Sequence, residues 1–67
     1  MLLQINGRKI EVPEEIGTVE QLLGHFGLEG KIVVVEQNGS IVEKQQHRDT
    51  SVFAGDQIEI VTFVGGG

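Results

Sequence analysis

Two Asn-Gly dipeptides divide this chain into short segments and constrain its fold more than any other feature. Asn6-Gly7 and Asn38-Gly39 each stand between runs rich in apolar residues. A two-residue type I′ turn needs positive φ at both central positions, and asparagine followed by glycine tolerates that conformation well. Each dipeptide therefore predicts a β-hairpin. The strands expected around the two turns are Leu2–Ile5, Lys9–Val12, Lys31–Gln37 and Ser40–Glu43.

A helix is predicted between the two hairpins. Thr18 can cap its first turn, and Gln21, three residues later, completes the capping-box pattern. Gly27 stands where a glycine commonly ends a helix. Apolar side chains recur at helical spacing and form a single stripe, which we assign to the core. The stripe consists of Val19, Leu22, Leu23 and Phe26.

The last strand is expected at Gln57–Phe63, where apolar and polar residues alternate. Ile58 and Ile60 fall on one face of such a strand, and Val61 and Phe63 fall on the other. If the isoleucines face the helix, Val61 and Phe63 lie on the open face of the sheet.

An exposed apolar patch beside the C-terminus is expected to dock a partner protein. Val33 and Val35, in the β-branched run of the third strand, are expected to join Val61 and Phe63 in this patch. The alternative is that the polar loop over Lys44–Gly55 covers the patch.

The Lys44–Gly55 loop carries the other residues that need an assignment. Val52 and Phe53 are expected to anchor it to the core. His47-Arg48-Asp49 is expected to be a solvated surface and not a catalytic group, because loops are polar and exposed and no nucleophile accompanies these residues.

The order hairpin, helix, hairpin and final strand predicts an α+β fold, in which one helix packs across a mixed sheet of four or five strands. With 67 residues, the chain is long enough for one domain but too short to enclose a deep pocket, which argues against an independent enzyme. No cysteine is present to form a disulfide or a thiolate metal site. We expect one domain over residues 1–64, followed by a flexible tail over residues 65–67.

The charge of the chain limits its partners. The formal net charge is -5, so a phosphate backbone would be repelled and a basic protein surface is the more natural partner. No segment approaches the roughly 20 apolar residues of a membrane span, and the amino end lacks the core of a signal peptide. We therefore expect no nucleic acid, no membrane and a cytoplasmic location.

The chain ends in Gly65-Gly66-Gly67 directly after an apolar strand. Because glycine has no Cβ, three glycines can enter a channel that excludes other residues. Extended, they span about 10 Å, and the terminal carboxylate is ionised at neutral pH. Such an end is an accessible nucleophile, or an acyl group once activated. The alternative is a frayed terminus without chemistry.

Taken together, these segments resemble the ubiquitin-like β-grasp sulfur carriers, and most closely the ThiS family of thiamin biosynthesis. The resemblance covers the whole chain, and the strand ending in Val-Gly-Gly-Gly is its most specific part. The segments that carry it are Ile5-Asn6-Gly7, Gly17-Thr18-Val19 with Leu22-Leu23, Val35-Glu36-Gln37-Asn38-Gly39, Gly55-Asp56-Gln57-Ile58-Glu59-Ile60-Val61 and Phe63-Val64-Gly65-Gly66-Gly67.

The resemblance implies a function for the tail. An E1-like adenylyltransferase would adenylate the carboxylate of Gly67, and a cysteine desulfurase or sulfurtransferase would supply sulfur to form a thiocarboxylate. Thiazole synthase would then receive the sulfur. ATP and magnesium belong to the adenylating partner, so this chain would bind no cofactor or metal and would hold no catalytic residue. Val64, Gly65 and Gly66 would thread the partner's channel.

Other functions remain open within the same superfamily. The small subunit of molybdopterin synthase shares the fold and the tail chemistry. Protein modifiers use the same terminus to form isopeptides with lysines. A further alternative is a β-grasp interaction module whose tail has no chemistry.

Overall fold

The computed structural model describes residues 1–63 of the chain. The expected boundary after residue 64 and the expected tail over residues 65–67 therefore lie outside the described part. The elements, in chain order, are β1 (Leu2–Ile5), β2 (Arg8–Glu11), α1 (Val19–His25), β3 (Val33–Gln37), β4 (Ser40–Val42), the 3₁₀ turn η1 (Lys44–Gln46) and β5 (Gln57–Thr62).

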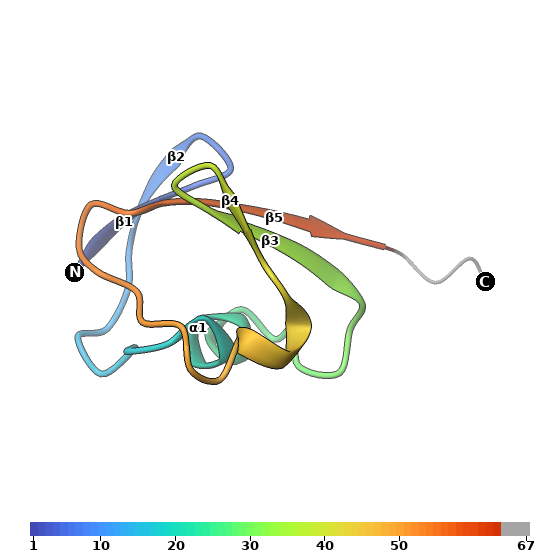
Figure 1. The fold of residues 1–67 in the computed structure, drawn as a ribbon. Coiled ribbons are helices and arrows are strands. Elements are labelled where there is room, and N and C mark those ends of the chain that lie inside the picture. The colour runs from blue at the N-terminus through green and yellow to red at the C-terminus, as the bar shows by residue number, and fades with distance from the viewer. Residues whose placement is uncertain (64–67) are drawn as a thin grey trace.

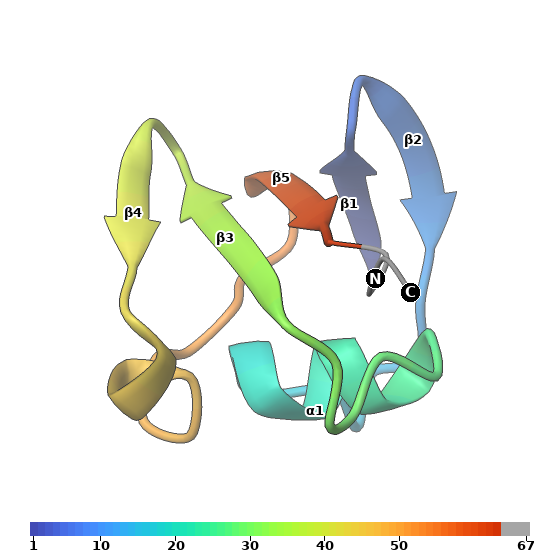
Figure 2. The same ribbon diagram turned by 90° about the vertical axis from the view of Figure 1, so that its right-hand side faces the viewer.

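The strands form one sheet in the order β2-β1-β5-β3-β4. Strand β5 lies in the middle, parallel to β1 and antiparallel to β3, while each outer strand pairs antiparallel with its hairpin partner. Helix α1 lies across one face of this sheet (Figures 1 and 2). The predicted α+β arrangement of one helix on a mixed sheet is confirmed. Within the described residues, no helix has the length and apolar character needed to span a membrane.

Both hairpins turn at the Asn-Gly dipeptides, as predicted. Asn6 and Asn38 each have a φ of 51°, and the glycines that follow them have φ values of 82° and 88°. The first turn pairs Ile5 with Arg8 across a two-residue connection. Positive φ at both positions is the requirement of a type I′ turn, whose twist matches that of the flanking strands.

Helix α1 begins and ends close to the predicted positions. The Thr18 hydroxyl accepts a hydrogen bond from the backbone N–H of Gln21 (3.2 Å). The Gln21 side chain reaches one residue further back than in a standard capping box and accepts from the N–H of Gly17 (2.7 Å). At the other end, Gly27 has a φ of 73°, which is typical of the glycine that terminates a helix.

The core lies between α1 and the face of the sheet that it covers. Of the two expected loop anchors, Val52 is buried but Phe53 is 65% exposed. Adjacent residues in an extended segment point in opposite directions, so only one of them can enter the core. The buried apolar residues are Leu3, Ile5, Val12, Val19, Leu22, Leu23, Val35, Val42, Val52, Ile58 and Ile60.

His47 differs from the prediction, because its side chain is buried while Arg48 and Asp49 remain exposed. Its Nε2 lies 3.1 Å from the carbonyl oxygen of Val42. A carbonyl can only accept, so Nε2 carries a hydrogen. The backbone of His47 also accepts a hydrogen bond from Glu20 of α1 (2.9 Å). These contacts give His47 a structural role in fixing the loop against the helix.

Asp56 organises the turn that leads into β5. Its carboxylate accepts hydrogen bonds from the backbone N–H of Phe53 (2.9 Å) and from the side-chain amides of Gln37 (2.8 Å) and Asn38 (3.1 Å). Burial by itself would raise the pKa of Asp56, but the three hydrogen bonds, foremost the one from Phe53, outweigh it and hold the pKa below its ordinary value. The carboxylate therefore stabilises the fold at neutral pH.

Replacing Asp56 with asparagine should lower the free energy of unfolding by about 2 kcal/mol, because one of the three donors then faces another donor. The depressed pKa adds a pH dependence. The stability is present above the unfolded-state pKa of about 3.9 and is lost as the pH falls through the lower folded-state value. Urea unfolding at pH 7 and at acidic pH measures both effects. Asp49→Asn, at an exposed position of the same loop, is the control, and equal losses in the two variants would refute the role of Asp56.

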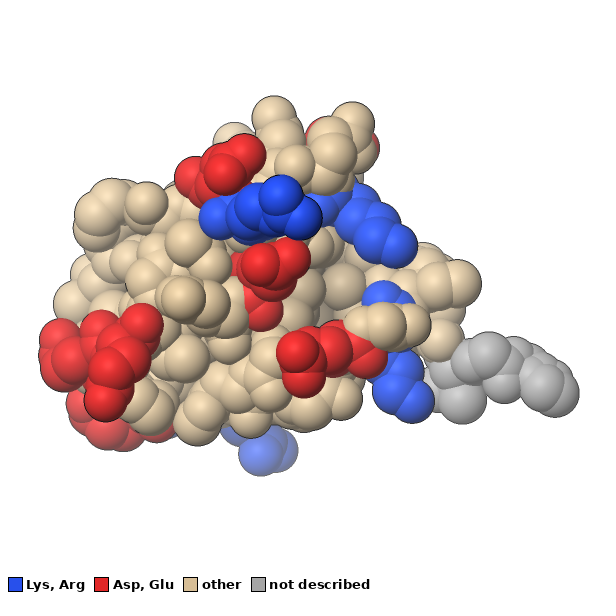
Figure 3. All heavy atoms as spheres, turned by 90° about the horizontal axis from the view of Figure 1, so that it is seen from below, with Lys and Arg blue, Asp and Glu red and all other residues tan. Residues whose placement is uncertain are grey.

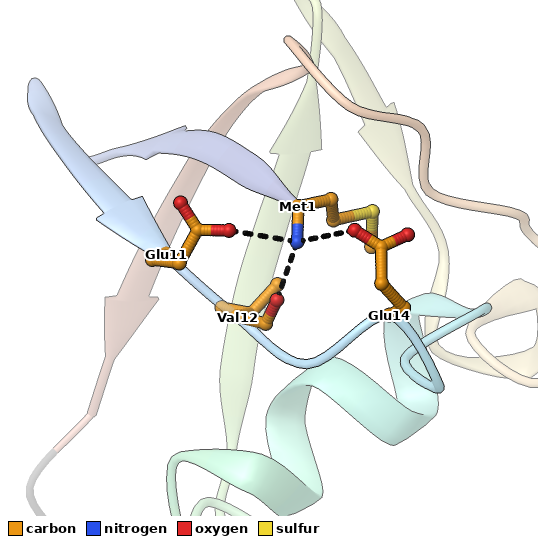
Figure 4. Close-up of polar contacts among 4 residues, drawn as sticks. All are labelled: Met1, Glu11, Val12 and Glu14. Carbon is orange, nitrogen blue, oxygen red and sulfur yellow. Dashed lines mark hydrogen bonds and ion pairs between the residues drawn. The ribbon is translucent and has the colours of Figure 1, made fainter.

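The α-amino group of Met1 binds to the end of β2 and to the residues that follow it (Figure 4). It donates a hydrogen bond to the carbonyl oxygen of Val12 (2.6 Å) and forms ion pairs with Glu11 (3.0 Å) and Glu14 (2.8 Å). The hydrogen bonds to Glu14 and Glu11 are the main reasons why the pKa of this ammonium group is raised.

The raised pKa of the Met1 ammonium predicts a loss of stability at alkaline pH. Its contribution is fully present below the unfolded-state pKa of about 7.7–8.0 and is lost as the pH rises through the higher folded-state value. The midpoint of urea unfolding should therefore decrease as the pH is raised above about 8. Chemically acetylated chain, which has no ammonium group at Met1, should lack this part of the pH dependence. An unchanged profile after acetylation would contradict the prediction.

Candidate functional site

Strand β5 and the residue that follows it carry two exposed apolar side chains on the face of the sheet that α1 does not cover. Val61 and Phe63 are each 55% exposed, whereas Ile58 and Ile60 are buried in the core. The predicted alternation of this strand is confirmed.

The prediction that Val33 and Val35 join these two residues on the open face of the sheet is wrong. Val35 pairs with Ile60 and is fully buried, and Val33 pairs with Thr62 and packs partly buried against the core. Residues paired across neighbouring strands lie on the same face of a sheet, so the partner of Ile60 must face the core. The four consecutive β-branched residues of this run show no alternation, and the sequence alone therefore could not reveal which of them face the helix.

The open face instead carries the other two residues of that run, Ile32 and Val34. Val34 lies directly opposite Val61, and the N–H of Phe63 donates to the carbonyl oxygen of Ile32 (3.1 Å), which continues the same pairing. Ile41 of β4 is exposed and pairs with Glu36, which lies on the same face of β3 as Val34. We call this set the apolar patch: Ile32, Val34, Ile41, Val61 and Phe63.

The loop over Lys44–Gly55 does not cover the apolar patch. It passes along the opposite side of the molecule, next to α1 (Figures 1 and 2). The backbone of α1 bonds to it twice, from Glu20 to His47 and from Val19 to Thr50, both at 2.9 Å. The expectation of an exposed patch is therefore confirmed, and the alternative of a loop cover is wrong.

Two glutamates border the apolar patch. Glu36 on β3 and Glu59 on β5 are direct cross-strand partners on the same open face. Like charges in this position destabilise a sheet, and here they place negative charge beside the patch. A partner surface that matches both features would be apolar at its centre and basic at its border.

The α1 side of the molecule has a different character, with acidic and basic side chains interspersed over its surface (Figure 3). It contains an open hollow of about 600 Å³ whose rim includes Glu20, Glu29, Lys31 and Lys44. Among residues 1–63, no three His, Cys, Asp or Glu side chains are grouped so that they could hold a metal ion.

The predicted reactive residue, Gly67, and the predicted channel residues Val64, Gly65 and Gly66 lie outside the described residues. The structure describes the chain up to Phe63, which donates a hydrogen bond to Ile32, the residue before β3. The tail therefore follows in sequence directly after the apolar patch.

One helix on a mixed sheet of this strand order, with the first strand parallel to the last in the middle of the sheet, defines the ubiquitin-like β-grasp class. Within this class, the model of the ThiS family matches residues 2–67. The chain belongs to the ThiS family.

Individual relatives agree with this assignment. The chain is 42% identical over 66 residues to the sulfur carrier protein ThiS of Bacillus subtilis, covering 98% of this chain and 100% of that protein. It is 43% identical over 67 residues to a thiazole synthase of Paramagnetospirillum magneticum, where the match covers 100% of this chain but 20% of that protein. The crystal structure of ThiS from Geobacter metallireducens superposes with a TM-score of 0.82 at 33% identity, over 100% of both chains.

Proposed function

We propose that this chain is a sulfur carrier protein, which bears sulfur as a thiocarboxylate on Gly67 and delivers it for formation of the thiazole of thiamin. The observation that carries the proposal is the match to the ThiS family, which extends through residue 67. The relative from Bacillus subtilis, named a sulfur carrier protein, supports it over its full length.

The chemistry requires little from this chain beyond its terminus. A carboxylate is a poor acyl donor, so it must first attack the α-phosphorus of ATP, which forms an acyl adenylate and releases pyrophosphate. The terminal sulfur of a persulfide on the donor then attacks the glycyl carbonyl and AMP leaves, which gives an acyl disulfide. A thiol attacks the donor's sulfur of that disulfide, so the thiocarboxylate is released and a new disulfide forms on the donor. A glycine has no side chain to hinder the attack on its carbonyl. ATP, magnesium and the catalytic side chains belong to an E1-like adenylyltransferase, so the chain acts as a substrate and not as an enzyme.

Thiazole synthase is the proposed acceptor of the sulfur. The protein of that name from Paramagnetospirillum magneticum contains a segment similar to this whole chain, which supports an association between the two activities. The sulfur donor is proposed to be a cysteine desulfurase or a sulfurtransferase. Because adenylation consumes ATP, we also propose that the chain works in the cytoplasm.

The apolar patch is the proposed docking surface for these partners. Val61 and Phe63 keep the role expected of them, while Val34, Ile32 and Ile41 take the place of the buried Val33 and Val35. Exposed apolar clusters of this kind mark interaction surfaces. Its position beside the start of the tail would orient the terminus toward the active site of a docked partner.

Intact-mass measurement tests the proposed chemistry. After incubation with ATP, the adenylating partner and a sulfur donor, the chain should gain the mass of one oxygen-for-sulfur exchange. No change in mass would favour an interaction module without tail chemistry, and an isopeptide adduct would favour a protein modifier. Rescue of a thiamin auxotroph, compared with rescue of a molybdenum-cofactor defect, separates this function from that of a molybdopterin-synthase small subunit.

A further inference from the structure

Strand β5 loses its neighbour on one side before it reaches the tail. Its parallel pairing with β1 comprises Gln4 with Gln57 and Ile5 with Ile58. The N–H of Asn6 still donates to the carbonyl oxygen of Ile58 (2.9 Å), but there the chain turns away into the first hairpin. From the next residue of β5 onward, no strand lies on this side within residues 1–63.

The side chain of Asn6 fills the place that the missing strand leaves. Its Oδ1 accepts a hydrogen bond from the N–H of Ile60 (2.7 Å), and its Nδ2 donates to the carbonyl oxygen of Ile60 (3.1 Å). A primary amide offers the same donor and acceptor as a peptide group. Asn6 therefore satisfies both backbone groups of a residue that is itself buried, and it extends the parallel ladder by one step.

Beyond Ile60 and up to Phe63, where the described residues end, the strand pairs on the β3 side. Val61 and Thr62 pair with β3, and Phe63 bonds to Ile32. Among residues 57–63, Ile60 is thus the last one that is hydrogen-bonded or paired on both sides of the strand. Because a strand rises about 3.3 Å per residue, a rotation of about 10° at Ile60 would displace Phe63, at the start of the tail, by roughly 2 Å.

We propose that Asn6 is a positioning residue for the reaction at the C-terminus. Its side chain fixes the course of β5 where β1 no longer can, and so sets the position and direction from which the tail leaves the apolar patch. This inference rests on the proposed function of the tail. Its chemical basis is that displacements of about 1 Å in a reacting group can reduce rates on the order of 100-fold.

The second hairpin provides a matched control. Asn38 stands in the same type of turn with the same φ of 51°, and its side chain also makes two hydrogen bonds, to the N–H of Gln57 (2.9 Å) and to Asp56 (3.1 Å). These bonds hold the first residue of β5 and the residue before it, at the end remote from the tail. Asn6→Gly and Asn38→Gly both keep a residue that tolerates positive φ and both remove two side-chain hydrogen bonds.

The first measurement needs no partner. Asn6→Gly should increase the hydrogen-exchange rate of the Ile60 amide about tenfold or more, because this amide loses its acceptor. Asn38→Gly should leave the exchange of Ile60 unchanged after correction for any change in global stability. Equal exchange of Ile60 in the two variants would show that Asn6 does not hold the backbone of Ile60, whatever the function of the tail.

The second measurement is the kcat/KM of adenylation by the E1-like partner. We expect a loss of about tenfold or more for Asn6→Gly and a value near that of the wild type for Asn38→Gly. Asn6→Asp keeps the acceptor for Ile60 but loses the donor, so its value should be intermediate, and it serves if Asn6→Gly does not fold. Equal values for the Asn6 and Asn38 variants refute the positioning role. A wild-type chain that is not adenylated refutes the proposed function instead.

Discussion

Replacing Gly66 with valine is expected to abolish adenylation of Gly67 while leaving the domain folded. The core and the sheet are built from residues 1–63, so the substitution removes no contact that we describe. A β-branched side chain beside the reacting carboxylate would obstruct a channel that a glycine backbone can pass. Because a misplacement of about 1 Å can cost on the order of 100-fold in rate, we expect at least that loss in kcat/KM, measured by ATP–pyrophosphate exchange.

Two further measurements make the Gly66→Val result specific. The variant retains the apolar patch, so it should still bind the adenylating enzyme and compete with the wild-type chain. Deleting Gly67 should also prevent the reaction, because it withdraws the carboxylate by one residue, or about 3.5 Å. Adenylation of Gly66→Val at the wild-type rate would show that the tail does not pass through a narrow channel.

Replacing Val61 with aspartate should weaken binding to the adenylating partner by about 100-fold or more. Val61 lies in the middle of the apolar patch, opposite Val34, and an unpaired carboxylate buried there in a complex would cost about 3 kcal/mol or more. In the free chain the side chain is exposed, so stability should change little. Titration calorimetry or fluorescence polarisation measures the affinity directly.

Phe53→Asp is the matched control for Val61→Asp. Phe53 is also an exposed apolar residue, but it precedes β5, at the end of that strand remote from the patch. The Phe53→Asp variant should bind the partner with the affinity of the wild type. If both variants bound equally well, the docking surface would lie elsewhere on the molecule.

The parts of the fold that follow from local chemistry could be predicted from the sequence. The two asparagine-glycine turns, the cap at Thr18 and the glycine that ends the helix at Gly27 all depend on residues close in the chain. The alternation of β5 also indicated which side chains face the core, because Gln57 and Glu59 mark its other face in the first half of the strand. These signals need no knowledge of the neighbouring strands.

The composition of the candidate site depended on information that is not local. The third strand is β-branched on both faces, so its orientation is decided by the pairing of Val35 with Ile60 across the sheet. A shift of one residue in that register would bury Val34 and would expose Val33 and Val35 in its place. The burial of His47 and the bond from Asn6 to Ile60 are likewise long-range contacts, and a loop histidine or a turn asparagine gives no sign of them in the sequence.

The central position of β5 has a consequence for the order of folding. Residues 57–62 form the strand that joins the first hairpin to the second, and Ile58 and Ile60 complete the core. During synthesis, neither hairpin can be bridged to the other until this segment has emerged, since its contacts with β1 span most of the chain. A chain that stops short of β5 would therefore leave the two hairpins unjoined. The apolar patch would form only in chains whose synthesis has reached the tail.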